Sequence, residues 1–307
     1  ERDCSIQRRN QKIVERAPAP YLSKKQRLQL CELGKKICSE VSYECAGTVE
    51  FLMDMDTNKF FFIEVNPRIQ VEHTVTEEVT GIDIVRAQIM LAEGSTIFEA
   101  TGKGSQEDIK LNGHALQCRI TTEDPLNNFI PDYGRITAYR GATGMGVRLD
   151  GGTAYSGAVI TRFYDSLLEK VTTWAPTAEA TVARMDRALR EFRIRGVSTN
   201  IAFVENLLKH KTFINNQYST KFIDETLELF EFSERQDRAT KLLNYIAEIT
   251  INGHPETKNF KRPATIEGKS VIPSINADQF SNSLPRTLER DGSLGVVNWI
   301  NNQRSLL

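Results

Sequence analysis

The chain has 307 residues, which is enough for two or three domains with cores of their own. Its 39 basic and 40 acidic residues give a net charge of −1, so overall charge indicates neither a nucleic acid nor a membrane surface as partner. No apolar run approaches the ~18 residues of a membrane span. The five cysteines are odd in number and lack Cys-x-x-Cys spacing, which indicates reduced, mostly buried thiols of an intracellular protein.

The first 16 residues carry five basic side chains together with the amides of Gln7 and Asn10. Such a stretch is either a solvated loop or a surface suited to phosphate or bicarbonate, and the residues alone leave both open. Ser23 is a typical N-cap for a helix over 24–41. The apolar face of that helix would consist of Leu28, Leu30, Leu33 and Ile37.

A β-hairpin is predicted next, because two runs rich in β-branched and aromatic residues, 45–53 and 60–66, flank a turn. Its arms carry Glu50 and Glu64, and carboxylates that face each other repel unless a proton or cation lies between them. Mg²⁺ favours a few carboxylates plus substrate phosphate oxygens, and Asn66 adds another oxygen. We therefore expect a metal site here. The alternative is that Glu50 points to solvent.

Polar residues occupy every second position of one stretch: Glu64, Asn66, Arg68, Gln70 and Glu72. This is the period of an extended chain, so the five side chains are expected on one side. A strand with a solvated charged face would show the same pattern. We interpret the stretch as a site because its oxygen ligands stand at one end and its Arg/Glu pair at the other.

The rest of the chain predicts an α+β fold. An amphipathic helix is expected over 74–93, ended by Gly94. Short alternating runs within 112–172, separated by Gly, Asp and Pro, indicate an antiparallel sheet or small barrel, and two helices follow near 177–192 and 199–209. From about 226 the chain reads as a connector or accessory module. Its predicted elements are a helix over 233–249, a polar stretch over 252–282 and a helix over 296–306.

Several motifs in order now resemble one family. They are Arg2-Asp-Cys-Ser-Ile-Gln7-Arg-Arg, Gly47-Thr-Val-Glu50-Phe, Glu64-Val-Asn66-Pro-Arg68-Ile-Gln70-Val-Glu72-His, Gln117-Cys-Arg-Ile-Thr-Thr-Glu-Asp-Pro, Gly146-Val-Arg148 and Tyr164-Asp-Ser166. Over residues 1 to about 225 the chain resembles the biotin carboxylase component of biotin-dependent carboxylases, an ATP-grasp fold, and within that family it is most similar to pyruvate carboxylases. The tail from Phe222 onward is similar to the segment that leads into their carboxyltransferase domain.

The resemblance implies three parts. Residues 1–95 would be the C-terminal portion of an ATP-grasp domain, and 96–225 the biotin carboxylase C-terminal domain, an antiparallel sheet or barrel with helices. Residues 226–307 would be a partly helical linker and the start of an allosteric or tetramerisation region. The family's glycine-rich phosphate lid and adenine-binding strand would precede residue 1. The chain is therefore expected to be a fragment that is inactive by itself.

The implied activity is that of a ligase: ATP and bicarbonate form carboxyphosphate, which carboxylates protein-bound biotin, and the parent enzyme passes the carboxyl group to pyruvate to give oxaloacetate. The implied catalytic residues are Glu72 as general base, Arg68, and Arg148 on the biotin enolate. Bicarbonate would be bound by Lys12, Arg68, Gln70, Val71 and Glu72. Gln70 and Arg148 would be near biotin. The nucleotide would contact Gln7, Asn10, Glu50, Leu52 and Glu64, and Mg²⁺ or Mn²⁺ would be held by Glu50, Glu64 and Asn66. Asn10 departs from the family, where histidine is usual, and cannot become cationic.

The implied cofactors are MgATP, Mg²⁺ or Mn²⁺, and biotin on a carrier domain outside this chain. The implied partners are that carrier domain, a carboxyltransferase domain, further copies of the chain (a dimer, and a tetramer in the parent) and acetyl-CoA as an allosteric activator, in the cytoplasm or the mitochondrial matrix. Three alternatives remain: the biotin carboxylase of an acyl-CoA carboxylase, a different ATP-grasp ligase, and a non-catalytic dimerisation or allosteric module.

Overall fold

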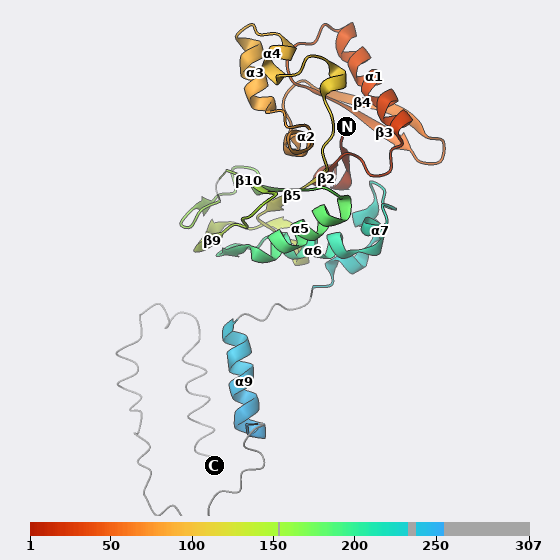
Figure 1. The fold of residues 1–307 in the computed structure, drawn as a ribbon. Coiled ribbons are helices and arrows are strands. Elements are labelled where there is room, and N and C mark those ends of the chain that lie inside the picture. Colours follow the sequence, from red (N-terminus) through yellow and green to blue (C-terminus); the bar gives the residue numbers. More distant parts are fainter. Residues whose placement is uncertain (153, 233–237, 255–307) are drawn as a thin grey trace, which may run out of the picture. The chain divides into compact units, whose positions relative to one another are not determined.

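The computed structural model describes residues 1–152, 154–232 and 238–254. The chain forms two compact units, Glu1–Glu234 and Arg235–Leu307. All residues predicted for the site belong to the first unit, which Figure 1 shows in red to teal.

An antiparallel five-stranded sheet forms the centre of the first unit. In spatial order it consists of β1 (Asp3–Arg8), β2 (Gln11–Ala17), β5 (His114–Thr121), β12 (Leu167–Ala175) and β10 (Val147–Gly151). The sheet ends at β1 and β10, and no sheet of the described residues closes into a barrel. The α+β prediction is confirmed, with the open sheet rather than the barrel. The sheet joins strands from before and after residue 95, and a domain boundary at that position stays a prediction.

Helices cover both faces of this sheet. Helices α5 (Ala178–Glu191) and α6 (Ile201–Lys209) pack on one face and α2 (His73–Thr80) on the other (Figure 1). Because side chains alternate along a strand, β5 contributes side chains to the cores on both faces of the sheet. The larger core, on the α5 and α6 side, contains Leu116, Cys118 and Ile120. Ala115 packs with Val75 and Val79 of α2 in a smaller cluster. The alternation turns the polar side chains of positions 117 and 119 towards α2.

Short elements connect these layers. They are α3 (Ile84–Ala92), α4 (Ile97–Thr101), η1 (Gln106–Asp108), β6 (Glu123–Asp124), η2 (Pro125–Asn127), β7 (Ile130–Pro131), β8 (Gly134–Arg135), β9 (Ala138–Arg140), β11 (Val159–Ile160), β13 (Arg193–Arg195), α7 (Lys211–Ile214), α8 (Phe222–Glu225) and η3 (Leu227–Phe230). The short strands pair as β6 with β7, β8 with β11 and β9 with β13.

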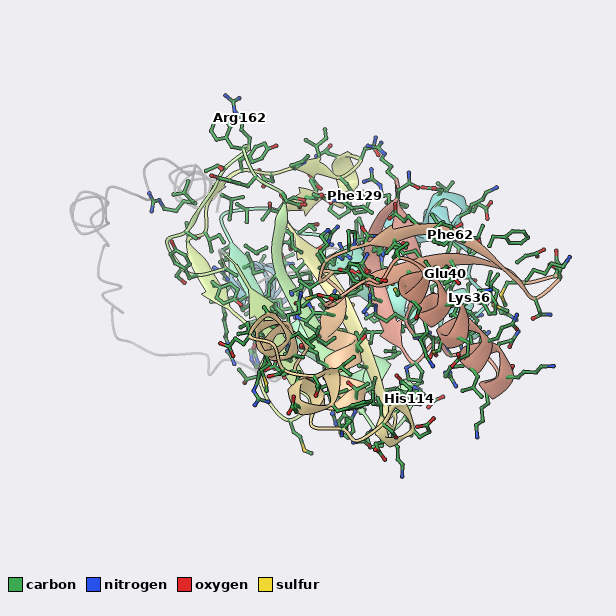
Figure 2. The ribbon with its side chains drawn as sticks, turned by 90° about the horizontal axis from the view of Figure 1, so that it is seen from above. Lys36, Glu40, Phe62, His114, Phe129 and Arg162 are labelled. Carbon is green, nitrogen blue, oxygen red and sulfur yellow. The ribbon has the colours of Figure 1, made fainter. Side chains whose placement is uncertain are left out.

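The predicted first helix and hairpin are both present. Helix α1 (Lys24–Glu40) begins at the N-cap Ser23, whose side chain forms a capping box with Gln26. No residue of α1 is fully buried, however: Leu28 of the predicted apolar face is exposed, and Leu30, Leu33 and Ile37 are half-buried. The hairpin pairs β3 (Thr48–Asp54) with β4 (Lys59–Asn66). Phe61, Phe62 and Ile63 of its apolar run are exposed, and Figure 2 shows Phe62 on this hairpin near α1.

Two further predictions need correction. The helix expected over 74–93 is two helices, α2 and α3, because the chain turns at Gly81 with φ 68° and restarts at the N-cap Asp83. All five cysteines are free, as predicted, but only Cys118 is buried. In the second unit, α9 (Arg238–Asn252) confirms most of the helix expected over 233–249, and the helix expected over 296–306 lies outside the described residues. None of the helices described here is both long and apolar enough to cross a membrane.

Candidate active site

The polar stretch 64–72 is not one extended strand, so the prediction of a single polar face is wrong. Strand β4 ends at Asn66, whose partner Thr48 is the first residue of β3. Pro67 cannot donate to a further ladder bond, and the backbone N–H of Arg68 turns back to the carbonyl oxygen of Asn66 at 2.9 Å. After this turn the chain leads into α2, whose N-cap is Glu72.

The break separates the five polar side chains. Glu64 and Arg68 are exposed, Asn66 is half-buried, and Gln70 and Glu72 are buried. The stretch therefore supplies groups at different depths.

Lys12 is the centre of the resulting cluster. Its Nζ lies 2.7 Å from Oε1 of Glu50 and 2.7 Å from Oε1 of Glu72. Strand β2, strand β3 and the start of α2 thus each contribute one charged group. The Glu72 side chain is only 2% exposed. Lys12 joins the predicted metal group at one end to the predicted general base at the other.

The hairpin carboxylates meet as predicted. Glu50 lies opposite Glu64 in the register, and Nδ2 of Asn66 donates to Oε1 of each, at 3.1 and 2.8 Å. Nε2 of Gln70 donates to the same Oε1 of Glu50 at 2.7 Å. Gln70 therefore belongs to this group, and its expected contact with bicarbonate stays a prediction.

The donor set fits a cation held together with a nucleotide rather than an all-protein metal cage. In the described parts of the chain, no three or more His, Cys, Asp or Glu residues come together so as to hold a metal ion. The Asn66 amide presents Nδ2 to both carboxylates here, so the two carboxylates are the oxygen donors of this group. They leave coordination positions open, and Mg²⁺ is commonly bound by one or two carboxylates plus substrate phosphates.

Two neighbours of Glu72 and Gln70 were missed by the sequence reasoning. Arg119 of β5 donates from Nη2 to Oε2 of Glu72 at 3.1 Å. Arg2 donates from Nη2 to Oε1 of Gln70 at 2.9 Å and to Oγ1 of Thr48 at 3.0 Å. Both arginines stand in the quoted motifs, which was the available signal. Their contacts depend on strands and turns that are far apart in the chain.

The cations around Glu72 decide its ionisation. Burial by itself would raise the pKa of Glu72, but the hydrogen bond from Lys12 and the charges of Arg2 and Lys12 outweigh burial, so the pKa lies below the ordinary value. Burial would likewise lower the pKa of Lys12, yet the Cys4 sulfur and the carboxylates of Glu50 and Glu72 raise it. The lysine is therefore cationic and Glu72 anionic at neutral pH.

Two predicted arginines lie outside this cluster. Arg68 is exposed, and its Nη1 donates to the backbone oxygen of Ile69. Arg148 of β10 forms ion pairs with Glu77 at 2.7 Å, Asp150 at 2.8 Å and Glu78 at 3.6 Å. No hydrogen bond or ion pair joins either arginine to Glu72.

The ion pairs of Arg148 change the pKa of its guanidinium. Burial would lower its pKa, but its bonds to Asp150 and Glu77 raise it above the usual range. The biotin role of Arg148 stays a prediction from the resemblance.

The remaining predicted residues are Val71, Gln7, Asn10 and Leu52. Val71 lines a small cavity with Lys12 and Arg119. Other walls of that cavity are Arg8, Asp165 and Phe129, and the guanidinium carbon of Arg8 lies 4.0 Å from the centroid of the Phe129 ring. Gln7 is half-buried on β1, Asn10 is exposed in the β1–β2 turn, and Leu52 is 49% exposed on the hairpin. The nucleotide contacts of these three stay predictions.

Comparison with known proteins identifies two domain families. Residues 1–100 match the carbamoyl-phosphate synthase L chain, ATP binding domain, and residues 117–225 match the biotin carboxylase C-terminal domain. The pyruvate carboxylase of Bacillus subtilis is 49% identical over 308 aligned residues, which cover 100% of this chain and 27% of that protein. The mitochondrial pyruvate carboxylase of Homo sapiens is 46% identical, with coverage of 100% and 26%. The chain thus spans about a quarter of the length of these relatives.

Solved structures give the same family. A complete multifunctional pyruvate carboxylase from Rhizobium etli has a TM-score of 0.76 at 64% identity, over 89% of this chain and 25% of that chain. The biotin carboxylase domain of Hydrogenobacter thermophilus 2-oxoglutarate carboxylase, solved with MgADP, ADP and bicarbonate, has a TM-score of 0.72 at 43% identity, over 76% of this chain and 50% of that chain. These matches confirm the resemblance read from the motifs: residues 1–100 belong to the family of the carbamoyl-phosphate synthase L chain, ATP binding domain, and residues 117–225 to that of the biotin carboxylase C-terminal domain.

Proposed function

We propose that the chain is the biotin carboxylase portion of a pyruvate carboxylase. The full-length enzyme would use ATP and bicarbonate to form carboxyphosphate, carboxylate biotin on a carrier domain, and pass the carboxyl group to pyruvate to give oxaloacetate. One observation carries the proposal: Glu72 is 2% exposed and held between Lys12 and Arg119, next to the hairpin carboxylates. The pyruvate carboxylase relatives that align over the whole chain support it.

Glu72 would be the general base for bicarbonate. An ionised carboxylate can take a proton from a bound anion only where cations stabilise the charge that develops, and Lys12 and Arg119 stand at its two oxygens. Bicarbonate that attracts the Lys12 ammonium would weaken the bond from Lys12 to Glu72. That loss would raise the pKa of Glu72 and make it a stronger base.

Glu50, Glu64 and Asn66 would hold the divalent cation of the nucleotide. When bound, Mg²⁺ or Mn²⁺ would neutralise phosphate charge at this end of the cluster. The protein groups themselves order the site: Asn66 and Gln70 donate to Glu50, and Arg2 orients the Gln70 amide.

Biotin, partners and compartment follow from the relatives and are proposed with them. Arg148 and Gln70 are the proposed biotin contacts, and a carrier domain, a carboxyltransferase domain and further copies of the enzyme are the proposed partners. One Rhizobium etli pyruvate carboxylase structure contains the allosteric activator acetyl coenzyme-A, so we propose the same ligand for the parent enzyme. The relatives include bacterial and mitochondrial proteins, and both compartments stay open.

The test is Glu72→Gln in the full-length enzyme, assayed by bicarbonate-dependent ATP cleavage. Loss of the general base should lower the rate by roughly 10²–10⁴. Glu191→Gln is the matched control, because Glu191 is 37% exposed and its ion pair within the described part of the chain is with Arg187 on the surface of α5. Retention of activity within a few-fold by the Glu72 variant, with the oligomer intact, would show the assignment to be wrong.

A further inference from the structure

A second buried carboxylate lies beside the site, and the proposed reaction does not use it. Glu15 of β2 is 0% exposed and stands opposite Gln117 of β5 in the sheet register. An ionised carboxylate is costly to bury unless charged or hydrogen-bonding groups satisfy it. Burial raises the pKa of Glu15, and the charge of Arg119 opposes that rise.

Each oxygen of Glu15 has one partner. Nε of Arg119 donates to Oε1 at 2.6 Å, and Nε2 of Gln117 donates to Oε2 at 3.0 Å. The Nη2 group of the same arginine donates to Oε2 of Glu72 at 3.1 Å. One guanidinium therefore bridges two buried carboxylates through different nitrogens, and its planar shape fixes the position of one carboxylate relative to the other.

Gln117 extends this connection to the backbone of the site. Its Oε1 accepts from Oγ1 of Thr74 at 2.5 Å, and the Thr74 hydroxyl also lies 2.7 Å from that of Thr172. Thr74 is in the first turn of α2, two residues after Glu72. Through Arg119 and Gln117, Glu15 thus restrains both the side chain of Glu72 and the start of the helix that carries it.

Stability alone gives little reason for a charged group at this position. Buried ion pairs are often no more stabilising than apolar residues of similar volume. Ala17, two positions along β2, packs in the apolar cluster beneath α2, so this side of the strand accepts apolar side chains.

We propose that Glu15 is a positioning residue: it holds the Arg119 guanidinium so that only part of its charge is directed at Glu72, which stays correctly placed and sufficiently basic. This inference rests on the proposed function. Arg119 also lines the cavity beside Lys12, so a shift of its guanidinium would change that cavity.

The direction of the effect distinguishes positioning from general stability. Glu15→Gln keeps an oxygen acceptor but removes the negative charge. Arg119 would then act on Glu72 alone, so the pKa of Glu72 would fall and its strength as a base would decrease. In the full-length enzyme we expect kcat/KM for bicarbonate to fall about 10- to 100-fold, because small misplacements of catalytic groups cost this much. The acid limb of its pH profile should move to lower pH.

Glu169→Gln is the matched control. Glu169 is a buried carboxylate of the same sheet, with a hydrogen bond from the Tyr139 hydroxyl at 2.6 Å. The Glu169→Gln variant should leave the acid limb of the pH profile in place.

Glu15→Asp keeps the negative charge on a shorter side chain. Its acid limb should lie closer to that of wild type than the limb of Glu15→Gln does, while its kcat/KM stays reduced. If Glu15→Gln fails to fold, the aspartate variant decides alone: a wild-type kcat/KM would overturn the proposal, and a fall of about 10-fold or more with an unchanged unfolding temperature would support it.

An unchanged rate in Glu15→Gln, or a loss equal to that of Glu169→Gln with the acid limb unmoved, would also overturn it. The Glu72→Gln variant separates the two proposals. If Glu72→Gln retains activity, the proposed function itself is contradicted. If Glu72→Gln loses activity while Glu15→Gln keeps the wild-type kcat/KM, only the positioning role is contradicted.

Discussion

Replacing Lys12 by methionine removes the cation at the centre of the cluster while keeping an unbranched side chain that is one atom shorter. The Glu72 carboxylate is 2% exposed and would lose a partner at 2.7 Å, and breaking a buried ion pair costs about 3–5 kcal/mol. The Glu50 contact is more exposed, at 22%, and adds at most about 1 kcal/mol. Because Arg119 still pairs with Glu72, we expect a total loss of about 3 kcal/mol at neutral pH.

The pH dependence follows from the two pKa shifts. The lowered pKa of Glu72 contributes stability that is present above its ordinary 4.5 and is lost as pH falls through the folded value. The raised pKa of Lys12 contributes stability that is present below its ordinary 10.5 and is lost as pH rises through the folded value. The difference between wild type and Lys12→Met should therefore be constant between these limits and shrink outside them.

Urea unfolding of the chain, followed by circular dichroism at neutral and acidic pH, measures this difference. Lys35→Met is the control, because Lys35 is 56% exposed and, among the residues that the structure describes, forms its ion pair with Glu32 on α1. We expect this variant to unfold like wild type. A loss below about 1 kcal/mol at neutral pH, or an equal loss at neutral pH and well below the folded pKa of Glu72, would refute the bridging role of Lys12.

Two further substitutions test the surroundings of the site. Arg148→Ala removes the partner that lies 2.7 Å from Glu77, a carboxylate that is 8% exposed. We expect the free energy of unfolding to fall by about 1.5–3 kcal/mol in urea titrations. An unchanged value would contradict the ion pairs described. Thr74→Val preserves shape but leaves Oε1 of Gln117 without this donor, which should cost about 1–3 kcal/mol. Thr101→Val, at the half-buried last residue of α4, removes only a hydrogen bond to Ile97 within the same helix and should have little effect in the same assay. Equal effects of the two threonine variants would argue against the buried network.

Much of the local structure follows from short stretches of sequence. The helix after Ser23 has its cap and capping box within four residues, and the hairpin that sets Glu50 opposite Glu64 depends on two neighbouring strands and their turn. Such features need only local hydrogen bonds and side-chain periodicity, so residue patterns suffice to predict them. The metal-type pairing of Glu50, Glu64 and Asn66 was predictable for the same reason.

Only the tertiary structure decided which charges surround Glu72. Lys12 and Glu15 come from β2 and Arg119 from β5, more than 100 residues along the chain, and they meet because these two strands are neighbours in one sheet. Alternation could not reveal this, since it gives the face of a strand but not the strand beside it. Alternation also misled between Asn66 and Glu72, where polar residues alternate through a turn. The hairpin register ends at the pair Thr48–Asn66, so the chain after Asn66 has no neighbouring strand, and an extended segment needs such a partner for its backbone hydrogen bonds.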